Sequence, residues 1–200
     1  MRQFKCLGVM MFLSANEIQN SVDSGELVIE PFNYKHLKPI SYVLQLSNHW
    51  LNWSISKEPI ALTDSCNTNN LLSSIFSSEE YVLSNNDFCL GSTIEKVSLP
   101  DDIAAVIAPL SHIARWGLCV NLGSLFVSPG FGNTCPTSLT LELKSQNPSP
   151  LLLKSGLPIC HLAFTRVRPG KMSYPLNRSV YDGLEAPLGP LMELEWSKMS

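Results

Sequence analysis

Charged residues are scarce in this chain of 200 residues. Asp, Glu, Lys and Arg make up 16% of it, where a globular protein usually has about a quarter. The net charge is −3, and Lys and Arg form no cluster, so binding a nucleic acid polymer is not expected to be the function. A pocket for a small phosphorylated molecule is compatible with this composition, because such a pocket needs only a few well-placed cations.

Closely spaced metal ligands are also missing. The sequence has no Cys-x-x-Cys pair, and it lacks the His-x-Glu and Pro-Cys-x-x-Cys motifs of zinc-dependent deaminases. A protein-bound metal is therefore not expected, and the cysteines are interpreted as free thiols in a reducing compartment. They are Cys6, Cys66, Cys89, Cys119, Cys135 and Cys160.

No apolar run is long enough to span a bilayer. The run at residues 6–13 follows Arg2 and Lys5 and matches a short secretory signal, although it is at the low end of length for one. Met11 offers a competing start, which would make residues 1–10 an extension of a cytoplasmic protein. Neither interpretation includes a membrane anchor.

Short strands are the elements that the composition favours. Apolar residues make up 44% of the chain, and 14 prolines with many Ser, Thr and Asn residues take the place of the missing charge. Their spacing predicts a mainly β fold, as a distorted barrel or sandwich. Strands are predicted at 27–32, 41–46, 80–83, 87–93, 94–99, 103–107, 118–127, 139–143, 151–154 and 159–164.

One helix is predicted before the first strand. Residues 14–17 (Ser-Ala-Asn-Glu) form a capping box, so a helix should begin there, continue to about Asp23 and end near Gly25. In contrast, residues 48–80 are rich in Asn and Ser and are predicted to be mainly exposed loop.

The chain is long enough for one domain with a substantial core. We expect an N-terminal extension at 1–10 and a β domain at 11–167. The segment 168–200 is rich in Pro and Gly and is predicted to be an arm rather than part of the core.

Three segments of the second half carry a hydroxyl, a guanidinium and a carboxylate in that order. The segment 109–117 reads Pro-Leu-Ser-His-Ile-Ala-Arg-Trp-Gly and contains Ser111 and Arg115. It is followed by Ser-Pro-Gly-Phe at 128–131 and by Leu-Thr-Leu-Glu-Leu at 139–143. Groups of these types can bind a nucleotide and transfer a proton.

Each segment also has an ordinary structural interpretation. Residues 111–117 could form a turn of surface helix, with Arg115 solvated and Trp116 in the core. In the last segment, strand alternation puts Glu142 on one face with Thr140 and the leucines on the other. Glu142 could then simply face solvent.

Taken together, the three segments resemble the dCTP deaminase family, which shares its fold with the trimeric dUTPases. That family carries Arg-Ser-Ser-x-x-Arg-x-Gly, then Asp-Pro-Gly-Trp/Phe, then a strand with a catalytic Glu. Its chains often begin Met-x-Leu-Ser, as residues 11–14 do here, which favours an extension at 1–10. The resemblance implies a distorted β-barrel of the trimeric dUTPase type, a homotrimer, and hydrolytic deamination of a cytosine deoxynucleotide to the uracil form and ammonia.

The resemblance also implies roles for individual residues. Glu142 would be the general base and acid, while Arg115 and Ser111 would position water and stabilise charge. Magnesium is expected on the nucleotide phosphates, not on protein ligands. The implied substrate-binding residues are Ser111, His112, Arg115, Ser128, Tyr174 and Tyr181.

Several positions depart from the family pattern. Leu110 stands where the family has its first Arg, and His112 replaces the second Ser. Ser128 replaces an Asp that activates water in the dUTPase branch, so dUTP pyrophosphatase activity is not expected. In the arm, Val180 and Leu184 fall where Lys and Gln would hold phosphate and base.

These departures leave an alternative function open. Two cations are lost from the expected phosphate site, and each charge-assisted contact contributes about 1.5–3 kcal/mol. The loop at 132–138 is also longer by about four residues than the family pattern. The chain could therefore be a catalytically impaired trimer that binds a nucleotide or a protein as a regulator, and a weaker alternative is pyrophosphate removal.

Overall fold

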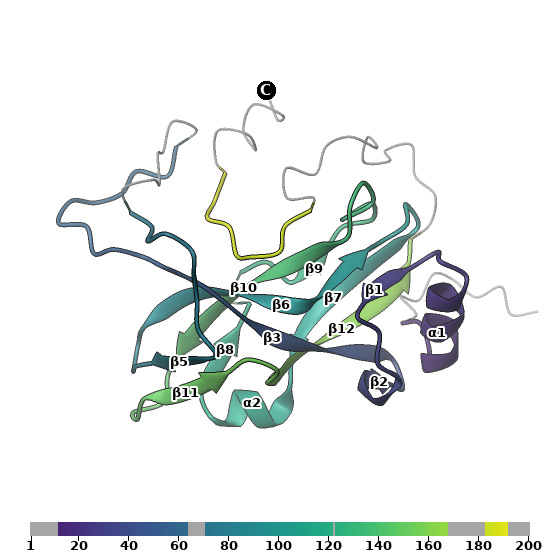
Figure 1. Ribbon diagram of the computed structural model, residues 1–200, viewed down its shortest axis with the longest axis horizontal. Helices are drawn as coiled ribbons and strands as arrows, with labels where there is room; N and C mark the ends of the chain where they lie inside the picture. Colours follow the sequence, from purple (N-terminus) through teal and green to yellow (C-terminus); the bar gives the residue numbers. More distant parts are fainter. Residues whose placement is uncertain (1–11, 64–70, 122, 168–182, 192–200) are drawn as a thin grey trace, which may run out of the picture.

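A computed structural model describes residues 12–63, 71–121, 123–167 and 183–191 of the chain, and Figure 1 shows the arrangement. Strands are the main regular elements of the described residues, as predicted. The described elements in chain order are α1 (Ala15–Asp23), β1 (Val28–Glu30), η1 (Tyr34–His36), β2 (Leu37–Lys38), β3 (Ser41–Asn52), β4 (Phe76–Ser77), β5 (Glu80–Leu83), β6 (Phe88–Ser98), β7 (Ile103–Pro109), α2 (Ser111–Arg115), β8 (Leu118–Val120), β9 (Phe126–Val127), β10 (Thr137–Ser145), β11 (Leu151–Lys154) and β12 (Pro158–Arg166).

A single curled antiparallel sheet dominates the described part of the molecule (Figure 1). Its main path runs β8-β10-β6-β3-β12-β7-β9, and β1, β2 and β4 pair with the sides of β6 and β3. Strands β5 and β11, far apart in sequence, form a separate antiparallel pair. Register shifts interrupt the pairing of β3 with β6, β10 with β6 and β12 with β3. Such irregularities bend strands, and the bends curl the sheet into an open barrel.

The apolar core fills the inside of this curl. Trp50 is fully buried there, stacks on Tyr81 with ring centroids 4.4 Å apart, and donates from Nε1 to the carbonyl oxygen of Ser78 at 3.0 Å. A buried indole costs little when its N–H is hydrogen-bonded in this way.

Helix α1 has the predicted capping box. The Ser14 hydroxyl accepts from the backbone N–H of Glu17, and the Glu17 carboxylate accepts from the backbone N–H of Ser14. Gly25 follows the helix with φ of +75°, a conformation that favours glycine and ends the helix where predicted. Ile18 is fully buried, which fixes the helix beside β12 and β1 (Figure 1).

Three predicted boundaries were wrong. The runs 87–93 and 94–99 form one strand, β6, because no turn residue separates them. Conversely, the run 118–127 divides into β8 and β9, since Asn121 takes φ of +53° and breaks the extended backbone. Strand β3 continues to Asn52 into the region predicted as loop, where it is paired with β6.

Membrane insertion through a helix has no support in the described ranges. Neither α1 nor α2 has the length and apolar character that a transmembrane helix needs.

Candidate functional site

Strand β10 presents Glu142 as the alternation predicted. Leu139, Leu141 and Leu143 are buried in the core, whereas Thr140 and Glu142 share the opposite, half-buried face. Across the sheet, Glu142 is paired with Leu90 of β6. The carboxylate therefore projects from a rigid central strand, which is a firm support for a reacting group.

The loop between β8 and β9 holds the Glu142 side chain. The backbone N–H of Gly123 donates to Oε2 of Glu142 at 3.0 Å, and the N–H of Asn121 donates to the Glu142 carbonyl oxygen at 2.9 Å. A Cβ at position 123 would lie 3.7 Å from Oε2, an ordinary contact distance. Gly123 was not predicted as a site residue, because the sequence around a glycine in a loop does not indicate which side chain will accept a hydrogen bond from its N–H.

Helix α2 is the predicted short helix, and it presents its polar residues to solvent. Ser111, His112 and Arg115 are exposed, while Ile113 anchors the helix in the core. Trp116 is 65% exposed, so the interpretation that placed it in the core is wrong. An exposed indole next to exposed hydroxyl and guanidinium groups is unusual on a free surface and typical of an interface.

Leu110, immediately before α2, belongs to the core. Its side chain is 6% exposed and joins the main apolar cluster. The position that would carry a phosphate-binding Arg in the family pattern therefore points inward here. In place of the cation, this position carries an apolar side chain that packs in the core.

Of the remaining predicted residues, Ser128 is among the described residues and the two tyrosines are not. Ser128 is exposed and follows β9, in a turn that continues through Gly130 with φ of +81°. Tyr174 and Tyr181, together with Val180, fall outside the described residues.

Part of the predicted arm packs on β10 beside the Glu142 face. In residues 183–191, the Leu184 carbonyl oxygen accepts from the Ser138 N–H at 2.8 Å, and the Leu188 N–H donates to Oγ1 of Thr140 at 3.3 Å. Figure 1 shows this segment running over the β10 side of the sheet. Thr140 shares its face with Glu142, so the arm reaches the neighbourhood of the carboxylate.

One chain does not bring the predicted catalytic residues into contact. Among the described residues, no hydrogen bond or ion pair joins Glu142 to Ser111, Arg115 or Ser128. The side chains of α2 face outward instead. The described hydrogen bonds of Glu142 are with the loop between β8 and β9 and not with α2.

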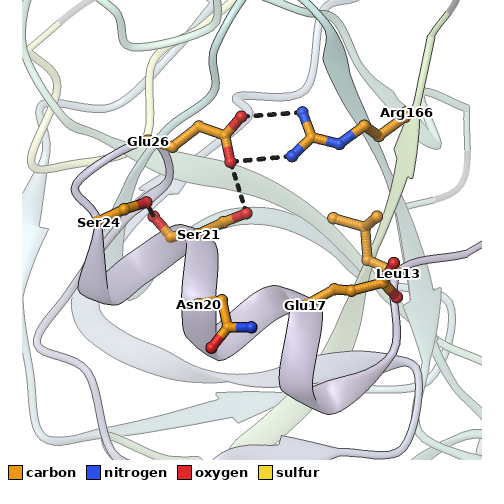
Figure 2. Close-up of a pocket in the computed structure, with 7 residues that line it drawn as sticks. All are labelled: Leu13, Glu17, Asn20, Ser21, Ser24, Glu26 and Arg166. Carbon is orange, nitrogen blue, oxygen red and sulfur yellow. Dashed lines mark hydrogen bonds and ion pairs between the residues drawn. The ribbon is translucent and has the colours of Figure 1, made fainter.

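A hollow of about 350 Å³ beside α1 is unrelated to these residues (Figure 2). Its guanidinium, from Arg166, is paired with both carboxylate oxygens of Glu26 at 2.9 and 3.0 Å and with Asp102 at 2.5 Å. A cation bound by two carboxylates is not free to hold an anion. We interpret this cluster as a cross-link between the α1–β1 turn and β12.

Metal binding by clustered side chains also lacks support where the structure is described. No group of three or more His, Cys, Asp or Glu side chains lies close enough together to hold an ion there.

The sequence matches known proteins over most of its length. The family described as dCTP deaminase-like matches residues 12–167. The "dCTP deaminase, dUMP-forming" of Dictyoglomus thermophilum is 30% identical over 195 residues, which cover 94% of this chain and 98% of that protein. The protein of the same name from Tropheryma whipplei is 32% identical over 192 residues, 90% of this chain and 92% of the other.

The fold agrees with these sequence matches. The crystal structure of 2'-deoxycytidine 5'-triphosphate deaminase from Agrobacterium tumefaciens superposes with a TM-score of 0.59 at 17% identity. The match covers 80% of this chain and 49% of that one, so it spans about half the length of the solved chain. The curled antiparallel half-barrel with a short N-terminal helix is thus a fold shared with that deaminase, and this chain belongs to the dCTP deaminase-like family.

Proposed function

We propose that this protein deaminates a cytosine deoxynucleotide of the dCTP type by hydrolysis, giving the uracil form and ammonia. The observation that carries the proposal is the placement of Glu142. Its carboxylate projects from the polar face of β10 and is held at 3.0 Å by the Gly123 N–H. Curated relatives that are 30–32% identical are named as dCTP deaminases, which supports the same chemistry.

The reaction needs one group that first accepts and then donates a proton. A water oxygen attacks C4 of the cytosine ring while the Glu142 carboxylate takes a proton from the water. The carboxylic acid so formed delivers that proton to N3 of the ring. The carboxylate then takes the second proton, from the new C4 hydroxyl, and delivers it to the departing amine. The C4–N bond breaks, ammonia leaves, and C4 becomes the carbonyl carbon of uracil.

Charge develops during the attack and must be stabilised. Arg115 supplies a guanidinium and Ser111 a hydroxyl, and preorganised groups of this kind contribute a few kcal/mol to a transition state. Both lie exposed on α2, away from the Glu142 of the same chain. We therefore propose a homotrimer in which α2 of one copy faces β10 of the next.

The residues available to bind phosphate differ from the family pattern. With Leu110 in the core, exposed His112 is the α2 side chain that could face a phosphate in its place. In our proposal Ser128, Tyr174 and Tyr181 complete the substrate site, the arm closes it, and Mg²⁺ arrives on the nucleotide phosphates. Because Ser128 carries no carboxylate to activate a second water, we expect the product to keep its pyrophosphate.

The test is turnover by purified protein and by Glu142→Gln. The proteins are incubated with dCTP, dCMP and deoxycytidine, ammonia is measured, and the nucleotide products are separated by chromatography. The introduced amide keeps the shape of the side chain but cannot transfer the proton, so kcat should fall by at least about 100-fold. Glu79→Gln, which changes an exposed carboxylate outside the site, is the matched control and should keep full activity.

The other outcomes are equally informative. Saturable nucleotide binding without product, unchanged in Glu142→Gln, would overturn catalysis and support the regulatory alternative. Formation of dUMP, as in the named relatives, would confirm deamination and contradict the expectation based on Ser128.

A further inference from the structure

A carboxylate that the proposed reaction does not use lies inside the barrel. Glu95, in the middle of β6, is only 1% exposed. Carboxylates are rarely buried so completely unless they are paired, because removing the charge from water is costly. Strand alternation places Glu95 on the same buried face as Thr93 and Val97.

Two groups contact this carboxylate. Oε2 accepts from the backbone N–H of Gln45 in β3 at 2.8 Å. Oε1 lies 3.7 Å from Nδ1 of His36, which is beyond hydrogen-bond length but close for a charge interaction. Nδ1 of His36 is itself buried and has no hydrogen-bond partner among the described residues. The carboxyl group and the imidazole thus face each other in the interior.

His36 belongs to a connecting segment that closes over this part of the barrel. Residues 31–38 join β1 to β3 and include η1 and β2 (Figure 1). The backbone N–H of Asn33 donates to the Tyr42 hydroxyl at 2.8 Å, and the rings of Phe32 and His36 pack on the Tyr42 ring at 5.2 and 5.8 Å. The segment therefore rests on Tyr42 and Glu95.

The other titratable groups beside Glu95 cannot balance its charge. Burial raises the pKa of Tyr42 in β3, and it raises the pKa of the Cys160 thiol in β12 to about 12, so both stay neutral near pH 7. Lys96 is the next residue of β6, but its ammonium pairs with Glu185 on the outer face. Among the described residues, His36 is left as the group facing Glu95 that can carry a positive charge.

We propose that Glu95 keeps its proton inside the barrel beside His36, and that loss of this proton above neutral pH releases residues 31–38 from the barrel. While the proton is present, the carboxyl group is neutral and adds no charge to the interior. Once it is lost, an unpaired carboxylate remains buried. The segment that covers it must then open to admit water.

The direction of the pH effect follows from burial. Burial raises the pKa of Glu95 from 4.5 to about 7 in the folded protein. The folded state thus binds more protons than the unfolded state between these values. The stabilisation from this group is complete below about pH 4.5 and is lost as the pH rises through about 7.

Hydrogen–deuterium exchange of the full chain tests the proposal. Protection factors for 31–38, corrected for the intrinsic exchange rate, should fall by at least about tenfold between about pH 6 and pH 8.5. Peptides from β10 serve as the internal reference. In Glu95→Gln the side chain stays neutral, and its amide can donate to Nδ1 of His36, so protection should no longer depend on pH. Glu30→Gln, a matched change at an exposed carboxylate just before the segment, should behave as the wild type does.

Two results would overturn the proposal. One is constant protection of 31–38 in the wild-type protein across this range. The other is a Glu95→Gln protein that keeps the pH dependence. If Glu95→Gln does not fold, the carboxyl carbon of Glu95 in wild-type protein can be followed by NMR, and a midpoint below about pH 5 would contradict a Glu95 that keeps its proton to neutral pH.

Discussion

The side chain at position 110 determines whether the missing phosphate contact could be restored by mutation. Leu110 is in the core, so an Arg placed there would bury an unpaired charge. Leu110→Arg should therefore lower the free energy of unfolding by about 3–5 kcal/mol. The melting temperature should fall by roughly 6–20 °C without any gain in nucleotide affinity. Thermal melts and a titration with dCTP measure the two effects.

His112→Arg is the contrasting variant for the same helix. His112 is exposed, so the guanidinium would stay in water and the stability should change by no more than about 0.5 kcal/mol. Nucleotide affinity should rise, because the added charge is permanent. Equal destabilisation by Leu110→Arg and His112→Arg would show that position 110 is not a core position.

Single residues were predictable where a local pattern determines them. Alternation along β10 was sufficient to place Glu142 beside Thr140 and away from the leucines. The partner of Glu142 was not predictable, because Gly123 reaches it through a loop whose path depends on tertiary structure. Glu95 and His36 are 59 positions apart in the sequence (95 − 36), and no local signal connects them.

At the scale of elements, the start of α1 depends on the hydroxyl of Ser14. This hydroxyl accepts from the Glu17 N–H and so satisfies a donor that the first turn of the helix leaves free. Ser14→Ala should therefore cost about 1 kcal/mol of folding free energy, and Ser14→Gly less. Denaturant unfolding followed by circular dichroism measures the difference.

A control for Ser14 is available on the same helix. Asn16→Ala changes an exposed residue to a better helix former, so the stability should stay constant or rise slightly. If Ser14→Ala and Asn16→Ala were equally stable, the capping box would contribute nothing to the fold.

The boundaries of elements were predicted correctly only where a particular residue favours a cap or a turn. Capping and Gly25 delimit α1, and both signals are local. Strands β8 and β9 were predicted as one strand, because the sequence does not indicate that Asn121 takes φ of +53°. The end of β3 was not predicted for another reason. The last residues of β3 are extended because they pair with β6, and this pairing cannot be inferred from the sequence of β3 alone.

At the scale of the whole molecule, the family and the mainly β fold could be recognised from ordered motifs, although each motif is altered. The arrangement of copies could not be derived from one chain. Ser111 and Arg115 on α2 and Trp116 just after it are exposed, and among the described residues none of them is hydrogen-bonded to Glu142 of the same chain. This is the observation behind the proposal of a site shared between copies.

Mixing two inactive variants tests this arrangement directly. Glu142→Gln lacks the proton carrier and Arg115→Ala lacks the guanidinium, so trimers of either variant alone should be nearly inactive. When the two variants assemble at random in equal proportions, about a quarter of all sites take an intact Glu142 from one chain and an intact Arg115 from its neighbour. Co-refolding the two variants should therefore recover about a quarter of the wild-type rate of ammonia release. If each chain held a complete site, every site in the mixture would carry one defect, and no activity would return even though size-exclusion chromatography showed mixed trimers.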